Sequence, residues 1–235
     1  MDQVQRIHEL LDEVQQKFDA LVGTVNNVLS HVPFLLRWAA DKFLDWWNGS
    51  VVPRWHDFWA EVGQFLSYLG APWVLESRQD AWADVGAPVA ARATESDRSA
   101  SDVDFEWTGQ AADRYSLSLG AQRSALAGVL DNLTSRIGPA LGSVASALYI
   151  FYAAVVAAVI AVVAGIVAAT GEAVTVLGLP LVPPTVLTAL GVAIVAIGAA
   201  VTNLRGQASG AASTFADIAN ETSSFGPGDW PAAVI

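Results

Sequence analysis

The chain has 235 residues, a formal net charge of -11 and no cysteine. The acidic balance disfavours nucleic acid and anionic lipid as electrostatic partners, because both require clustered Lys and Arg, and the lack of cysteine excludes disulfides and thiolate sites. Charged residues make up only 15%, well below the usual fraction of about 25%, and hydrophobic residues make up 53%, above the typical fraction of about 45–50%.

The first predicted element is a single helix of about 30 residues that ends at Pro33. Apolar residues recur there at alternating steps of three and four, a spacing typical of a helix with one buried face. Two interpretations remain open: the face packs within the protein's own bundle, or it binds a coiled-coil partner. The seam consists of Val4, Ile7, Leu11, Val14, Phe18, Leu21, Val25, Val28 and Val32.

Residues 33–73 are rich in aromatic side chains and are predicted to form two short amphipathic helices. Asn48-Gly49-Ser50 is expected to separate the two helices, and Pro53 suits the first turn of the second. Tryptophan is favoured where one end of the ring is dry and the other wet. These rings could therefore form a core, contact a membrane surface or contact another protein.

A Trp-x-Gly motif, Trp107 to Gly109, follows a predicted helix over 76–101. Alanines at 111–112 and Tyr115 extend the motif, and an apolar seam continues to residue 148. Glycine permits a tight reversal of the chain at Gly109, Trp107 can pack at that turn, and the alanines let the second helix lie close. The pattern predicts a helix–turn–helix.

This motif between two helical patterns resembles the WXG-type (early secreted antigen-like) superfamily, which actinobacteria and relatives export through type VII secretion systems. The resemblance covers about residues 82–148 and implies an antiparallel helical hairpin, export in folded form and pairing with a second helical hairpin. A long segment precedes the motif, an apolar hairpin follows it, and no Tyr-x-x-x-Asp/Glu export signal is present. The chain therefore looks like the longer relatives, which include secretion-associated proteins and trafficking domains of toxins, with a partner supplying the signal.

Two long apolar stretches meet at one acidic residue. No charged side chain lies between Arg136 and Glu172, or between Glu172 and Arg205. The predicted arms, 142–169 and 184–204, are each long enough to cross a hydrocarbon core, which needs about 20 helical residues. Small residues recur every fourth position in the first arm, a spacing that favours close helix packing in lipid or in protein. They are Ala153, Ala157, Ala161, Gly165 and Ala169.

These patterns predict an all-α protein, an elongated helical bundle in four consecutive segments. No catalytic motif, cofactor motif or convincing metal-ligand spacing occurs, so we expect no enzyme activity, no cofactor, no metal and no small-molecule substrate. The segments are the heptad helix with the Trp-rich helices (1–73), the WXG-like hairpin (74–145), the hydrophobic hairpin (146–204) and a polar C-terminal segment (205–235) that holds a short helix at 207–222.

Three functions compete for the hairpin. In a pore- or channel-forming subunit it would stay packed in the bundle until it entered lipid, with Glu172 at its tip. In a structural or interaction protein it would be a permanent core or an interface, with a WXG-type partner or in a homo-oligomer. In a resident protein of the inner membrane, Arg136 and Arg205 would weakly favour both termini inside. Acidic residues interrupt any signal-like run near the N-terminus, so we expect a secreted or cell-envelope protein without a cleaved signal peptide in the first two cases.

Overall fold

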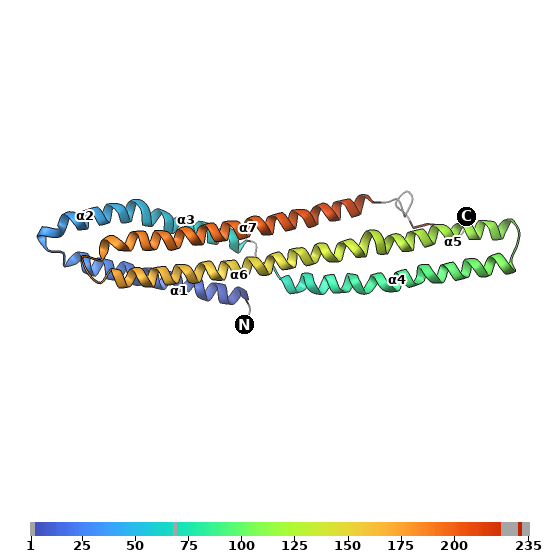
Figure 1. The fold of residues 1–235 in the computed structure, drawn as a ribbon, viewed down its shortest axis with the longest axis horizontal. Coiled ribbons are helices and arrows are strands. Elements are labelled where there is room, and N and C mark those ends of the chain that lie inside the picture. The colour runs from blue at the N-terminus through green and yellow to red at the C-terminus, as the bar shows by residue number, and fades with distance from the viewer. Residues whose placement is uncertain (1–2, 68–69, 222–229, 232–235) are drawn as a thin grey trace. The chain divides into compact units, whose positions relative to one another are not determined.

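A computed structural model describes residues 3–67, 70–221 and 230–231, and every regular element in these ranges is a helix. The prediction of an all-α protein is confirmed. The elements, drawn in Figure 1, are α1 (Gln3–Ser30), η1 (Phe34–Leu36), α2 (Arg37–Trp46), η2 (Trp47–Val51), α3 (Val52–Leu66), α4 (Pro72–Glu106), α5 (Gln110–Gly128), η3 (Val129–Thr134), α6 (Ser135–Glu172), η4 (Leu179–Leu181) and α7 (Val182–Asn220).

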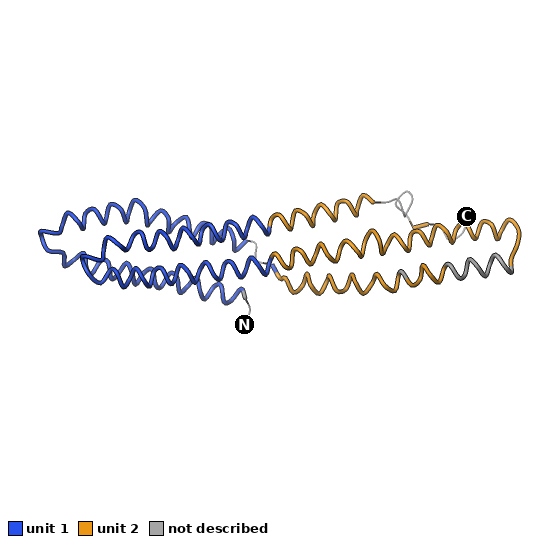
Figure 2. The backbone as a smooth tube through the Cα atoms, viewed as in Figure 1, with its two compact units in different colours: residues 1–70, 148–204 blue, residues 71–147, 205–235 orange. Residues whose placement is uncertain are grey.

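The chain divides into two compact units, each built from two separate stretches (Figure 2). Unit 1 holds residues 1–70 and 148–204, and unit 2 holds residues 71–147 and 205–235. Both boundaries in the second half fall inside helices, α6 and α7. Unit 1 therefore consists mostly of the first and third predicted segments, 1–73 and 146–204. Unit 2 consists mostly of the second and fourth, 74–145 and 205–235. Parts of the fourth, 222–229 and 232–235, lie outside the described residues.

Helix α1 buries its heptad seam inside unit 1. Ile7, Val14 and Leu21 are fully buried, and Phe18 stacks on Trp55 of α3 with the ring centres 3.7 Å apart. The helix ends at Ser30, ahead of Pro33, because a proline ring restricts the preceding backbone and cannot continue a helix. The seam thus follows the first interpretation, a face of the protein's own bundle.

The aromatic segment divides between core and surface. Phe34 and Trp38 are exposed, whereas a second group is buried. The expected break at Asn48-Gly49-Ser50 is wrong, since the chain stays helical through the π-helical turn η2. Both ends of this turn, Trp47 and Val51, are buried, so the turn is anchored in the core on both sides of Gly49. The buried group is Phe43, Trp47, Trp55, Phe58 and Phe65.

In unit 2, α4 packs against α5 and η3. At Gly86 a β-carbon would lie 2.7 Å from the hydroxyl oxygen of Thr134, so α4 approaches η3 too closely for a side chain at this position. The helix expected at 207–222 is confirmed as far as Asn220, but it is the continuation of α7 and does not begin separately at residue 207. One interior glycine, Gly206, costs only about 1 kcal/mol, and Asp217 lies 3.8 Å from the guanidinium of Arg136.

Candidate membrane-contacting surface

One face of the apolar hairpin is part of the core of unit 1. The ring of Phe151 on α6 meets Phe65 of α3 edge-on, with the centres 5.8 Å apart. The hydroxyl of Tyr152 donates a hydrogen bond to the carbonyl oxygen of Gly70 at 2.5 Å. Every third or fourth residue along each arm is buried, as the heptad-like pattern requires. The buried positions include Val155, Val159, Val162 and Ile166 on α6 and Val186, Leu190, Ala193 and Ile197 on α7.

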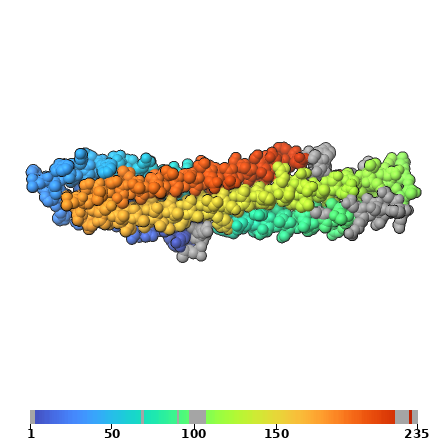
Figure 3. All heavy atoms as spheres, viewed as in Figure 1, coloured from blue at the N-terminus to red at the C-terminus, as the bar shows by residue number. Residues whose placement is uncertain are grey.

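The opposite face of the hairpin is exposed and carries no charge. Val195 is 72% exposed, Ile150 58% and Val192 57%. In Figure 3 the two arms, coloured yellow and orange, form much of the visible surface of unit 1. We name these exposed positions the outward face; they are Ile150, Ala153, Ala157, Ile160, Ala164, Val167 and Gly171 on α6, Leu181 at the end of η4, and Thr188, Val192, Val195, Ala199 and Thr202 on α7.

The outward face has the length of a bilayer's hydrocarbon core. Along α6 it runs from Ile150 to Gly171, which at 1.5 Å per residue is about 32 Å, against about 30 Å for the hydrocarbon core. Soluble monomers rarely expose a continuous apolar surface of this extent, and such surfaces mark sites that contact protein or membrane. The outward face can therefore exclude water against lipid or against another apolar surface.

The predicted stripe of small residues is divided between two environments. Gly165 faces Ala189 of α7 so closely that no β-carbon would fit there, and Ala169 is fully buried. Ala153 and Ala157, by contrast, are exposed on the outward face. An open groove of about 490 Å³ runs where the arms approach, and it is lined by Ala161, Gly165, Pro184, Thr185, Thr188, Ala189 and Val192.

Glu172 lies at the end of α6, where the first arm ends. Its Oε1 accepts a hydrogen bond from the hydroxyl of Thr185 at 3.1 Å, while its Oε2 is buried and has no partner among the described residues. In the connection between the arms, Leu177 is 85% exposed. The acidic group is therefore tied to the first turns of α7.

The turn between α4 and α5 brings together the three residues singled out in the extended motif, Trp107, Gly109 and Tyr115. Gly109 has φ +108° and ψ 177°, and it is the single described residue with positive φ. The ring of Trp107 lies 5.9 Å from that of Tyr115, and both rings are partly exposed. The turn thus requires a glycine, and the two rings cover one another beside it.

We predict that Gly109→Ala destabilises the protein by about 1–3 kcal/mol, because this backbone region is accessible almost only to glycine. Thermal unfolding followed by circular dichroism measures the effect. Gly120→Ala is the matched control: Gly120 lies within α5 with open space at its β-carbon position, so the same change should stabilise by about 0.5–1 kcal/mol. A neutral Gly109→Ala would contradict the required turn geometry.

One group of residues was missed at the level of sequence. Trp38, Lys42 and Trp46 line a second groove together with Pro180 of η4. The spacing of the three α2 residues, four positions apart, could have indicated that they share one face of a helix. That Pro180 lies near them depends on the fold. Metal ligands do not gather into any group of three or more in the described part of the chain.

Two helical stretches, Gln110–Glu172 and Leu179–Asn220, are long and apolar enough to cross a membrane by length and composition. In their most apolar windows, 39% and 33% of the residues are buried. No protein-family model, no curated protein and no solved structure matches this chain.

Proposed function

We propose that this protein is a non-enzymatic, membrane-interacting protein whose apolar hairpin contacts lipid through the outward face. In solution the inner face of the hairpin packs in the core of unit 1, where Phe151 meets Phe65 of α3. On insertion, lipid would replace those protein contacts, and several copies could line a pore.

The observation that carries the proposal is the charge-free outward face. Most surface helices place charged residues opposite their buried face, as α1 does with Asp12, Lys17 and Asp19. The arms of the hairpin place Ile, Val, Ala and Thr there instead. Lipid is the environment in which such a surface costs nothing to expose.

The resemblance to WXG-type proteins supports a setting for this activity. It favours a protein associated with type VII secretion, located outside the cell or in the cell envelope, with a second helical hairpin or further copies of itself as partner. The turn formed by Trp107, Gly109 and Tyr115 is the feature that carries this part of the proposal.

Flotation and dye release from phosphatidylcholine vesicles test the proposal. The purified protein, prepared without detergent, should float with the vesicles and release a trapped dye at neutral or acidic pH. An absence of both effects, under conditions in which a known pore-forming toxin is active, would refute it.

One observation favours a second function, that of an interaction protein. The groove beside Gly165 is walled by small residues, which allow another helix to approach closely. In that case the outward face would be a subunit interface, and the protein would be a monodisperse oligomer in water that ignores vesicles. Light scattering coupled to size-exclusion chromatography distinguishes this outcome.

A further inference from the structure

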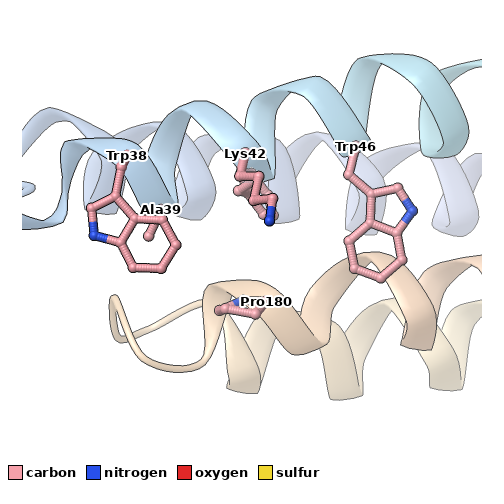
Figure 4. A pocket seen from close by; sticks show the side chains of 6 residues that line it. Trp38, Ala39, Lys42, Trp46 and Pro180 are labelled. Atoms are coloured by element: carbon pink, nitrogen blue, oxygen red, sulfur yellow. The ribbon is translucent and has the colours of Figure 1, made fainter.

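A groove beside the hairpin connection combines aromatic walls with a single cation. Trp38, Lys42 and Trp46 are spaced four residues apart on α2, so they share one face of that helix. In Figure 4 the three side chains extend from α2 toward Pro180. The groove measures about 430 Å³, within the range of about 300–1,000 Å³ in which proteins hold small ligands. Ala39 and Phe43 complete its lining.

The charge of the groove is opposite to that of the chain. Lys42 is the one charged side chain in the lining, and in the described ranges it forms no ion pair with a carboxylate. Asp41 and Asp45 are its neighbours on α2, but neither lines the groove. An apolar groove with one ammonium group fits a ligand with an apolar body and an anionic end.

The surroundings of the groove indicate where such a ligand comes from. Phe34, Leu35 and Leu177 are each at least 80% exposed, and they lie in the turns that flank α2 and η4. The guanidinium carbon of Arg37 lies 5.6 Å from the centre of the Phe34 ring. Exposed apolar side chains with tryptophans and cations next to them are typical of segments that enter a bilayer to the depth of its head groups.

We propose that this groove binds an anionic phospholipid of a bilayer, with an acyl chain between Trp38 and Trp46 and the phosphate at the ammonium group of Lys42. This inference rests on the proposed membrane function and assigns the first lipid contact to the groove. Apolar contact supplies most of the binding, and Lys42 supplies a preference for anionic head groups.

The test compares partitioning into phosphatidylcholine vesicles with and without phosphatidylglycerol, measured by flotation at low salt. Lys42→Gln should reduce the preference for phosphatidylglycerol about fivefold, the contribution of one lysine at an anionic surface. Trp46→Ala should weaken binding to both vesicle types about tenfold, since the apolar surface of its indole no longer enters lipid.

Two control variants make the result specific. Lys17→Gln removes the same charge from an exposed position of α1, and Trp73→Ala removes an indole that is 50% exposed in unit 2; neither should change binding. If wild type floats and Lys42→Gln and Trp46→Ala behave as these controls do, the groove assignment is overturned and the membrane function stands. If wild type floats with no vesicle type, the membrane function itself fails.

Discussion

Val195→Glu should reduce binding to phosphatidylcholine vesicles about 100-fold. Val195 lies in the middle of the outward face and is 72% exposed, so a glutamate at this position should leave the folded structure unchanged. A carboxylate there must enter the hydrocarbon core with the hairpin, at a cost of about 2.5–3.5 kcal/mol on insertion scales. Flotation measures the partition coefficient, and dye release should fall with it.

Gln16→Glu is the matched control. It adds the same charge at an exposed position of α1, on the charged side of the bundle, where lipid contact is not expected. Its partition coefficient should equal that of wild type. If both variants bind equally well, the outward face does not meet lipid; if Val195→Glu instead splits a soluble oligomer, the interface function is the correct one.

Phe65→Ala should lower the free energy of unfolding by about 3–5 kcal/mol and accelerate dye release. Phe65 is fully buried and packs on Phe151, and truncating such a ring leaves a cavity that the core cannot fill. The lost contact joins α3 to α6. The variant therefore also raises the population of states in which the hairpin is no longer packed on α3. Urea denaturation measures the first effect, and the initial rate of dye release measures the second.

A control in unit 2 separates the two effects. Phe215→Ala truncates the same side chain where it is 37% exposed, and it should change neither stability nor release appreciably. Slower release from Phe65→Ala at equal protein concentration would argue that the hairpin acts without leaving α3. An unchanged unfolding free energy would contradict the packing of α3 on α6.

Periodicity was enough to predict the helices that bury one face. The alternating steps of three and four predicted the buried face of α1. The two long stretches without charge predicted the helical hairpin. The π-helical turn at Trp47–Val51 was not predictable, because Gly49 is a local breaker that tertiary anchoring of its neighbours overrides. The continuity of α7 through Gly206 has the same origin: one weak residue does not end a helix that is anchored by buried residues before and after it, Leu204 and Ala211.

The candidate surface was predictable only in part. The sequence shows that the arms are uncharged, but which of their residues face outward depends on how they pack in unit 1, where α6 contacts α3. The small-residue stripe shows this division, since Gly165 meets Ala189 whereas Ala157 is exposed. The groove at Lys42 needed Pro180 to be brought near from more than 100 positions along the chain, a contact that no local pattern encodes.

The spacing of the exposed residues along the outward face also constrains the lipid or protein that covers it. Alternating three and four gives a period of 3.5 residues, whereas a straight helix turns every 3.6, so the exposed line winds by about 20° per heptad. From Ile150 to Gly171 the winding amounts to about 60°. A fluid phase follows such a spiral without strain, whereas a second helix must supercoil with the same hand to stay in register.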